Sequence, residues 1–244
     1  MLTDMDKNAV LARLPTRERE LIIASFTLRQ LQLGEVLDQP EETMKFLYFP
    51  IEAAISVVTM EDKQHMVDIT VIGKEGCSGS SIVQGTDKAP FMTLVEIGGS
   101  AIQVATSDLK ERLPQMPYLD AALARYNLLL LRHSGISVGC SQFHSAPERL
   151  ARWLKAHWHR TGLESFPFSS DFLAAQAGLD PKTTAEILKD FEQEGLIEKT
   201  LRYVRIANQE GLKMRACQCF KLSSEATDQY VRDLPEIARS YGSS

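Results

Sequence analysis

The cysteines and histidines are the side chains best suited to metal, redox or nucleophilic chemistry. The chain has 244 residues with five histidines and four cysteines, which are Cys77, Cys140, Cys217 and Cys219. One residue separates Cys217 from Cys219, a spacing that suits joint ligation of an ion less well than CxxC does. We therefore expect no metal, and interpret the pair as alternate side chains of one strand. Zinc bound with the help of His157 and His159 is the alternative.

Two further sets of residues could react or bind a cofactor. Cys77 lies in the loop "VIGKEGCSGSSIVQG" and could respond to oxidation if the pKa of its thiol were lowered. A small buried residue is the simpler interpretation. His65 and His133 are the possible haem ligands, although isolated histidines usually serve structural hydrogen bonds. The chain contains no P-loop, HExxH, GxSxG or compact carboxylate pair, so we expect neither an enzyme nor a cofactor.

Composition and charge set the class of protein. At 44% hydrophobic and 24% charged residues the chain is typical of globular proteins, and it has no run of about 18 apolar residues. Residues 1–144 hold 13 Lys or Arg against 18 Asp or Glu, which accounts for the net charge of -5. The start has no signal-peptide pattern. We expect a cytoplasmic protein of two domains with different partners, and no membrane partner.

Residues 27–106 have the pattern of an antiparallel sheet. Short runs such as "KFLYFP", "MVDITVIG" and "FMTLVEIGG" are rich in β-branched and aromatic residues, and Gly, Pro or Asp separates them. Strands at such short intervals favour an antiparallel β-barrel or jelly roll. We assign residues 1–116 to this barrel.

A long helix is predicted over residues 117–144. Apolar and small residues recur there at alternating spacings of four and three, which is a heptad-like seam. The seam positions are Leu119, Leu123, Tyr126, Leu130, His133, Ser137 and Cys140. A lone barrel rarely needs a helix of about 40 Å, so we expect the seam to join two chains in a homodimer. Packing of the helix on its own barrel is the alternative.

Residues 145–220 are predicted to form a winged helix-turn-helix. Two short helices meet at Gly178 in "FLAAQAGLDPKTTAEILKDF", and two strands follow around 200–203 in "IEKTLRYVRIAN". The order helix, helix, helix, strand, strand is that of a winged helix-turn-helix, whose second helix enters the major groove of DNA. Residues 221–244 remain as a C-terminal tail, and the overall fold class is α+β.

The second helix of this pair is acidic, although DNA is a polyanion. From Asp180 to Glu194 it carries five acids against two lysines. Only its first turns touch bases, and Asp180 is suited to cap it with Pro181 at the first position. The expected base contacts are Pro181, Lys182, Thr183, Thr184 and Glu186. These turns lack the arginine that most often contacts guanine, which predicts modest affinity.

Phosphate contacts are expected on both flanks of that helix. The basic residues of the preceding helix and of the wing are the candidates, and two serines can cap the first helix of the pair. These residues are Arg149, Arg152, Ser169, Ser170, Lys199 and Arg202. Their interpretation as ordinary solvated charges is the alternative.

The order of parts over residues 5–220 resembles the Crp/Fnr superfamily of bacterial transcription regulators. The stretches "LYFPIEAAISVV", "ERLARWLKAHWHRTG" and "FLAAQAGLDPKTTAEILKDFEQEGLIE" carry the resemblance, and "LKMRACQCF" is similar to the cysteine-bearing end of one subgroup. The resemblance implies a cyclic-nucleotide-binding-like sensory barrel before a dimerisation helix and a DNA-binding domain. It also implies that "VIGKEGCSGSSIVQG" forms an effector pocket, with Glu75, Gly76, Cys77, Gly79 and Lys88 as candidate residues.

The same resemblance argues against two effectors. Members that bind cyclic nucleotides have an Arg-Ser pair that grips the phosphate, where this chain has Ala89-Pro90-Phe91-Met92, and Lys88 offers only a point charge. Members with an iron–sulfur cluster use N-terminal cysteines, and residues 1–76 contain none. The effector is therefore left unassigned.

These patterns predict a homodimeric transcription regulator that binds double-stranded DNA, with RNA polymerase as a further candidate partner. The acidic reading helix leaves an alternative open. In that alternative, the same fold serves as a protein-interaction module that does not bind DNA.

Overall fold

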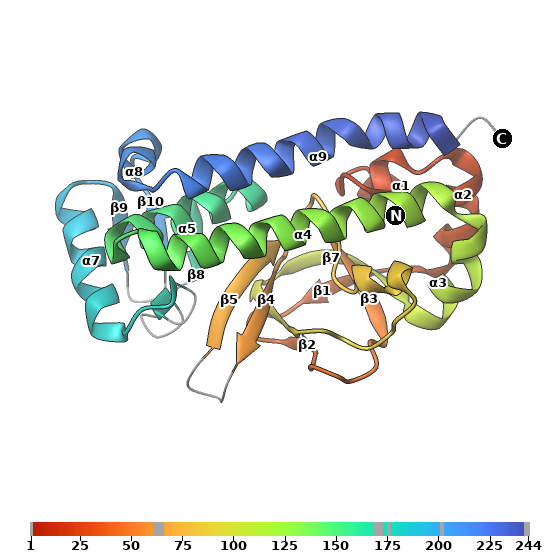
Figure 1. Ribbon diagram of the computed structural model, residues 1–244, viewed down its shortest axis with the longest axis horizontal. Helices are drawn as coiled ribbons and strands as arrows, with labels where there is room; N and C mark the ends of the chain where they lie inside the picture. Colours follow the sequence, from red (N-terminus) through yellow and green to blue (C-terminus); the bar gives the residue numbers. More distant parts are fainter. Residues whose placement is uncertain (1, 61–65, 168–172, 175–176, 201–202, 242–244) are drawn as a thin grey trace. The chain divides into compact units, whose positions relative to one another are not determined.

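The computed structural model describes residues 2–60, 66–167, 173–174, 177–200 and 203–241 (Figure 1). The chain divides into two compact units. The first unit comprises Met1–Val57, Val71–Leu131 and Ala226–Ser244, and the second comprises Val58–Thr70 and Arg132–Glu225.

The first unit contains most of the β-structure, preceded by short helices. Its strands are β1 (Phe26–Leu31), β2 (Val36–Asp38), β3 (Phe46–Pro50), β4 (Ala54–Met60), β5 (Met66–Ile72), β6 (Met92–Ile97) and β7 (Gly99–Ala105), with β4 and β5 crossing the boundary between the units. Its helices are α1 (Leu2–Met5), η1 (Leu11–Arg13), α2 (Thr16–Ile22), η2 (Ile23–Ser25), η3 (Ser80–Gln84), α3 (Thr106–Arg112) and η4 (Leu113–Gln115).

The strands form two sheets, in the orders β1-β7-β3 and β2-β6-β4-β5. In the first sheet β7 pairs antiparallel with both neighbours, so that Ile102 faces Leu28 on one side and Phe49 on the other. Apolar side chains of both sheets are fully buried, among them Leu47, Ile55 and Val95. The predicted α+β class is confirmed, although among the described strands the two sheets do not close into a single barrel.

Helix α4 (Pro117–Phe143) is the long helix expected from the sequence. Its first turn is capped by a buried carboxylate, because Glu18 accepts from the backbone N–H groups of Tyr118 at 2.8 Å and Leu119 at 3.0 Å. A helix start leaves four N–H groups without partners, and Glu18 satisfies two of them. Burial raises the pKa of Glu18, and the two N–H donors act against that rise.

The second unit contains the winged helix-turn-helix. Its described elements are α5 (Ala146–Thr161), β8 (Ser165–Pro167), α7 (Pro181–Gln193), β9 (Ile197–Lys199), β10 (Tyr203–Ile206) and α8 (Gln209–Arg215). The three strands form an antiparallel sheet in the order β8-β10-β9. The predicted strand pair is confirmed, with β8 as a third strand. A capping box begins α5, since Ser145 and Glu148 bond to each other's backbone N–H groups.

Residues 221–244, which the sequence left as a tail, are helical as far as Tyr241. They belong to α9 (Cys219–Tyr241), which begins in the second unit and continues in the first from Ala226 (blue in Figure 1). The interpretation of Cys217 and Cys219 as neighbours on one strand is wrong, because Cys217 lies in the link after α8 and Cys219 is the first residue of α9. In the described part of the chain no helix has the length and apolar character needed to cross a bilayer.

Candidate nucleic-acid interface

Helix α7 starts at a well-defined cap. The side chain of Asp180 accepts from the backbone N–H of Thr183 at 2.9 Å, and Pro181 occupies the first helical position. Hydrogen bonding to Thr183 lowers the pKa of Asp180. The turn before it contains Gly178 at φ 62°, a left-handed conformation that glycine adopts without strain. These local features agree with the predicted helix-turn-helix.

One stripe of α7 is polar and exposed. Lys182, Glu186, Lys189 and Gln193 follow one another at spacings of four, three and four, so they share one helical face, and all four are exposed. The opposite face is buried through Ile187, Leu188 and Phe191. The stripe that can meet DNA thus has two lysines and one acid. Sequence reasoning missed Lys189 because it considered the first turns only.

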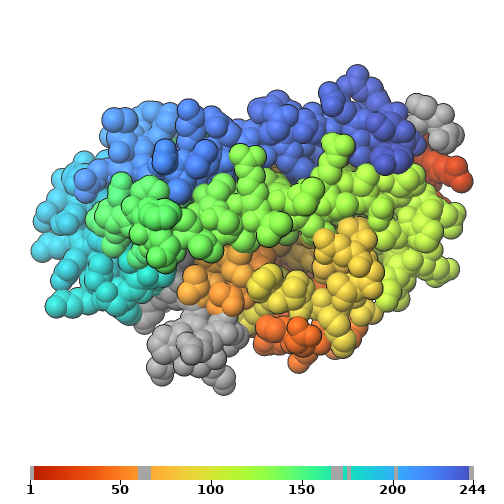
Figure 2. Space-filling model, in the orientation of Figure 1, coloured from red at the N-terminus to blue at the C-terminus, as the bar shows by residue number. Residues whose placement is uncertain are grey.

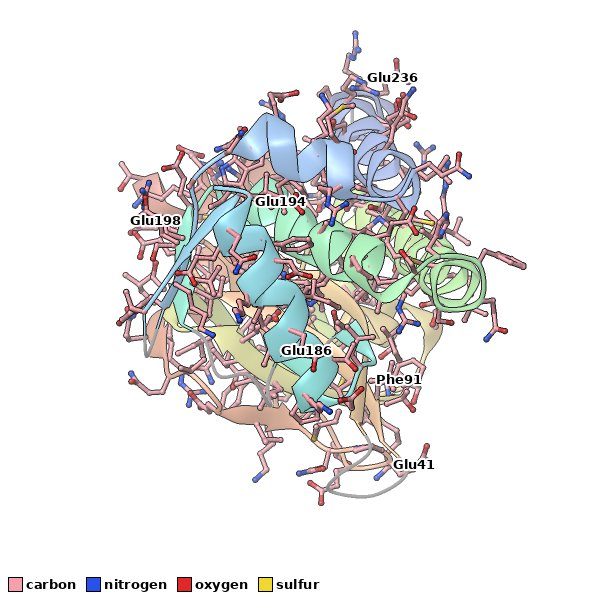
Figure 3. The ribbon with its side chains drawn as sticks, turned by 90° about the vertical axis from the view of Figure 1, so that its left-hand side faces the viewer. Glu41, Phe91, Glu186, Glu194, Glu198 and Glu236 are labelled. Atoms are coloured by element: carbon pink, nitrogen blue, oxygen red, sulfur yellow. The ribbon has the colours of Figure 1, made fainter. Side chains whose placement is uncertain are left out.

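The remaining acids of α7 lie off this stripe and partly have partners. Glu194 forms an ion pair with Arg215 at 3.2 Å, and Glu192 accepts from the backbone N–H of Lys199 at 3.3 Å. Figure 3 shows Glu186 and Glu194 toward opposite ends of α7. Two of the acids are thus engaged within the protein, whereas Asp190 is exposed one turn after Glu186.

The predicted base-contact residues differ in exposure. Pro181, Lys182 and Glu186 are exposed and Thr183 is partly buried. Thr184 is fully buried, and its hydroxyl donates to the backbone carbonyl of Asp180 at 3.0 Å. Thr184 must therefore be removed from the candidates, because a side chain committed to the helix start and the core cannot reach a base edge.

The two arginines proposed on α5 make contacts within the protein. Arg149 donates to the carbonyls of Ser141 and Gly178, at 3.2 Å each. It therefore braces the turn of the helix-turn-helix. The Nε atom of Arg152 is buried, and its charge acts on the sulfurs of Cys140 and Cys217. Both side chains are partly buried, and their predicted contact with phosphate stays a prediction.

The wing supplies fewer described cations than the sequence suggested. Lys199 is exposed on β9, whereas Arg205 on β10 is paired with Glu198. Three other predicted contacts lie outside the described residues, namely Ser169, Ser170 and Arg202. Of the predicted basic contacts, Lys182 and Lys199 are exposed, and Lys189 is a further exposed lysine on the same face of α7 as Lys182.

The effector loop of the first unit is packed with protein side chains. Glu75 is buried, and its carboxylate accepts from the backbone N–H of Gly73 at 3.0 Å. A Cβ atom at Gly76 would overlap the ring of Tyr126 on α4, and the Tyr126 ring lies 5.5 Å from that of Tyr230 on α9. The Tyr126 ring thus covers the glycine of the loop.

The other loop candidates are not arranged as an anion site. Cys77 is fully buried, and burial raises the pKa of its thiol, which opposes the reactive thiolate form. Gly79 turns the chain at φ 74°. Lys88 is exposed and donates to the hydroxyl of Thr43 at 3.0 Å.

The predicted dimer seam on α4 faces the interior of the chain. Leu119, Leu123 and Tyr126 are fully buried, and His133 and Cys140 are at most 4% exposed. Leu130 and Ser137 are partly buried. The side chains of this seam are covered within one chain, which agrees with the alternative interpretation for these residues.

A different face of α4 is apolar and open. Leu128 is 66% exposed, Leu131 is 69% exposed and Val138 is 65% exposed. Gly135 lies between them, and nothing lies within 4 Å of the position of an added Cβ atom. In the space-filling view α4 is uncovered (green, Figure 2). The four residues 128, 131, 135 and 138 have heptad spacings of three, four and three, and we call them the exposed seam.

Of the two possible haem ligands, the structure describes only His133. His133 is held by protein groups, since Arg160 Nη2 lies 3.0 Å from Nδ1 and the carbonyl of Ser223 lies 3.3 Å from Nε2. His65 lies outside the described residues.

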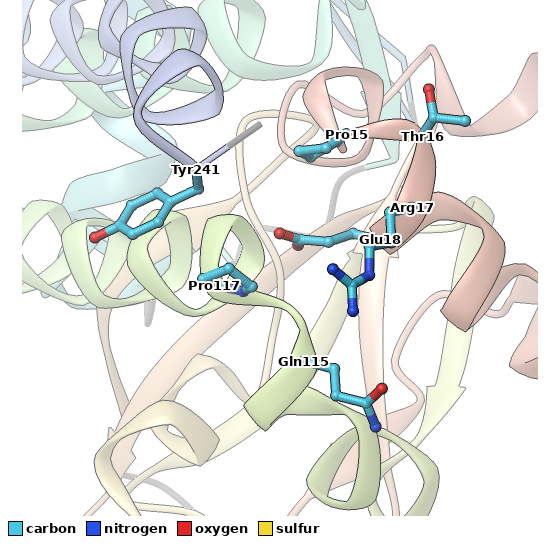
Figure 4. A pocket seen from close by; sticks show the side chains of 7 residues that line it. All are labelled: Pro15, Thr16, Arg17, Glu18, Gln115, Pro117 and Tyr241. Carbon is cyan, nitrogen blue, oxygen red and sulfur yellow. The ribbon is translucent and has the colours of Figure 1, made fainter. Parts of the chain in front are cut away.

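The first unit has a surface pocket of about 320 Å³ (Figure 4). It is lined by Pro15, Thr16, Arg17, Glu18, Gln115, Pro117 and Tyr241. Its buried carboxylate, Glu18, is the cap of α4.

Comparison with known proteins agrees with this arrangement. Residues 148–215 match the Crp-like helix-turn-helix domain. The chain is similar in structure to FixK2 from Bradyrhizobium japonicum, with a TM-score of 0.66 and 15% identity over 79% of this chain and 98% of that one. It is also similar to a CRP-family transcriptional regulator from Thermus thermophilus, with a TM-score of 0.62 and 15% identity over 77% and 96% of the two chains.

A third similar structure is CLP, the c-di-GMP responsive global regulator of Xanthomonas campestris, with a TM-score of 0.58 and 15% identity over 78% of this chain and 98% of that one. No curated protein matches the sequence. The resemblance to the Crp/Fnr superfamily is thus confirmed: the chain has the fold of the Crp/Fnr transcription regulators. Its second unit contains a helix-turn-helix domain of the Crp-like family.

Proposed function

We propose that the protein is a homodimeric, DNA-binding transcription regulator that acts in the cytoplasm. The observation that carries the proposal is the exposed stripe of α7, with Lys182 and Lys189 on the outer face of a capped second helix. This helix belongs to the matched Crp-like domain. Helices in this position enter the major groove, and lysines on such a face bind phosphate or guanine.

The exposed seam of α4 supports the homodimer. Large apolar residues at heptad spacing are unusual on a surface that stays in water, and they indicate a partner with a matching face. A second copy of the chain provides that face by two-fold symmetry. Gly135 allows close approach of two helix backbones at the middle of the seam. We therefore reassign the dimer contact to Leu128, Leu131 and Val138.

The first unit retains a sensory role in this proposal, without a cyclic nucleotide as its effector. Two features of the loop support this. Its phosphate side carries Ala89-Pro90 in place of an arginine, and the ring of Tyr126, which itself packs on the ring of Tyr230, lies over Gly76. The proposed partners are double-stranded DNA and a second chain, with RNA polymerase as a candidate, and no catalytic activity is assigned.

Genome-wide selection of DNA fragments with purified full-length protein tests the proposal. The wild type should enrich a roughly palindromic site, and its affinity should fall steeply with salt. Lys182→Ala should weaken binding to the selected site by about 1 kcal/mol or more and lower the salt slope by about one. The matched control is Lys221→Ala, another exposed lysine of the second unit, on α9, which should leave binding unchanged.

One observation favours the protein-interaction alternative, namely the acids that α7 and its end retain at 190, 192 and 194. The same experiment decides between the two functions. If the dimer retains no duplex DNA even in dilute salt, the regulator is excluded and the interaction module takes its place.

A further inference from the structure

Four side chains with metal-binding atoms converge in the second unit, and none of them belongs to the exposed stripe of α7. They are Cys140 in the last turn of α4, His144 directly after that helix, Cys217 in the link after α8, and Cys219 at the start of α9. One ligand atom from each residue lies within 4.8 Å of all the others. All four cysteines of the chain are free thiols, so no disulfide uses these atoms.

The pairwise distances fit a single small ion. The Sγ atoms of Cys140 and Cys217 are 3.5 Å apart, and Sγ of Cys219 is 3.6 Å from Nδ1 of His144. Ligands about 2.3 Å from a tetrahedral zinc ion are about 3.7 Å from one another. Iron–sulfur clusters contain several metal atoms and hold their cysteine sulfurs farther apart, so the compactness of the group favours one ion.

The local backbone explains why the four atoms meet. Cys140 and His144 are one helical turn apart, and the backbone N–H of His144 donates to the carbonyl of Cys140 at 3.2 Å. The link that carries Cys217 turns into α9, and the backbone N–H of Phe220 donates to the carbonyl of Cys217 at 3.1 Å. In an extended strand, one residue between two cysteines makes it difficult for both to bind the same ion. This turn brings Cys217 and Cys219 to the same side, so both sulfurs can reach one ion.

The surroundings suit a site with negative ligands. The three cysteines are at most 6% exposed and Ile136 packs against them, so water has little access. Arg152 brings a positive charge that acts on all three sulfurs. Three thiolates and one neutral imidazole around a divalent ion carry a net charge of about -1, and the guanidinium offsets it.

Sequence reasoning suggested other histidines for such a site. The ring of His157 stacks on Trp153 at 3.9 Å between centroids, and the ring of His159 lies edge-on to Phe220. The cluster contains neither of them. The ligand that completes the cluster, His144, directly follows the helix that carries Cys140 and is 75 positions from Cys219 in the sequence.

We propose that Cys140, His144, Cys217 and Cys219 bind one zinc-class divalent cation in a tetrahedral Cys₃His site. Such a four-ligand set leaves no open position, so the ion has a structural role and no catalytic one. Binding releases the protons of the thiols to solvent and links the last turn of α4 to the first turn of α9 within the second unit. The metal-loaded folded state is then favoured over the unfolded chain.

Titration of the reduced, metal-free full-length protein with Co²⁺ tests the proposal. One equivalent per chain should give the visible bands of tetrahedral cobalt and thiolate-to-metal charge transfer in the near ultraviolet. Zn²⁺ should displace the cobalt, and the protein purified with its own metal should contain about one zinc per chain. Chelation should lower the thermal midpoint, and added Zn²⁺ should restore it.

Variants identify the ligands. Cys219→Ala and His144→Ala should each weaken metal binding by roughly 100-fold or more. Removing a residue that only hydrogen-bonds to a metal ligand already lowers the affinity for the metal by about 10- to 100-fold, and removing the ligand itself should lower it further. Cys77→Ala is the matched control, since Cys77 is the one cysteine outside the cluster and is also buried. Should a variant fail to fold, the intensity of the cobalt charge-transfer band in the wild type still counts the thiolate ligands.

Four outcomes would overturn the proposal. The reduced wild type could show no tetrahedral cobalt spectrum, or Cys219→Ala could bind as tightly as Cys77→Ala. The protein could also contain iron and sulfide in place of a single ion. Isolation of a Cys140–Cys217 disulfide that, once reduced, still binds no metal would assign the cluster to redox chemistry instead.

Discussion

His133 is neutral in the folded protein, and its partners show why. The guanidinium of Arg160 can only donate, so the Nδ1 atom that it contacts at 3.0 Å must accept, and the ring proton lies on Nε2 toward the carbonyl of Ser223. Burial, followed by the charge of Arg160, lowers the pKa of His133 from 6.5 to about 3. The ring is therefore a hydrogen-bonding element of the core.

This neutral ring predicts a pH dependence of stability. The unfolded chain takes up a proton at His133 below pH 6.5 and the folded protein does so only near pH 3, so unfolding binds a proton between these values. The stability present above pH 6.5 should be lost as the pH falls through this window, by at most about 1.4 kcal/mol per pH unit. His133→Asn, which keeps an acceptor for Arg160, should flatten this part of the curve.

Urea unfolding from pH 7.5 to 4 measures the effect as the difference between wild type and variant, because the carboxylates contribute equally to both proteins. His159→Asn, on α5 in the same unit, is the control and should keep the slope of the wild type. Parallel curves for the wild type and His133→Asn would show that the folded protein protonates His133 as readily as the unfolded chain does.

At the scale of elements, the contact between α4 and the effector loop depends on the absence of a side chain at Gly76. An added Cβ would overlap the Tyr126 ring, which is fully buried and therefore has little room to move aside. Gly76→Ala should destabilise the protein by about 1–3 kcal/mol through overpacking. In a protein that already carries Tyr126→Ala, Gly76→Ala should lower the free energy of unfolding by clearly less than in the wild type, because the ring that the new methyl group would overlap is absent.

Denaturant unfolding of the two single variants and the double variant measures this coupling. Strict additivity of Gly76→Ala and Tyr126→Ala would mean that the loop and α4 do not touch in solution.

The sequence predicted the elements whose signals are local. The Asp180-Pro181 start of α7 and the glycine turn at 178 depend on neighbouring residues, and both are present in the structure. The wing strands likewise follow from a short alternating run. These features need no knowledge of distant parts of the chain, which is why residue spacing was sufficient.

The phase of α4 and the cysteine cluster could not be predicted in this way. The helix has two apolar stripes, one through Leu119 and Leu123 and one through Leu128 and Leu131, and periodicity cannot show which of them the chain covers itself. The cluster joins Cys140 to Cys217, which are 77 positions apart. A contact of that separation depends on the tertiary fold, and the CxC spacing alone pointed away from it.

At the scale of the whole molecule, dimer formation and DNA binding should fail together. Two reading helices about 34 Å apart on a two-fold axis match half-sites one turn of DNA apart, and each chain alone binds only one half-site. Linking two weak contacts raises the apparent affinity by a factor of about 100 or more. The exposed seam of α4 is the proposed link, so a charge placed there should remove this gain.

Leu131→Asp introduces that charge at a residue that is 69% exposed in the single chain, so the fold of the monomer should survive. Two aspartates would face each other across the two-fold axis, away from water. Sedimentation equilibrium should show monomers, and affinity for a selected two-half-site duplex should fall by about 100-fold, with binding to a single half-site unchanged.

The matched control is Leu33→Asp, the same change at a leucine that is 53% exposed between β1 and β2. It should remain a dimer and bind the duplex as the wild type does. Monomers of Leu131→Asp that still bind the duplex with wild-type affinity would separate DNA recognition from dimerisation. A variant that remains a dimer would show that the chains associate through a surface other than the exposed seam.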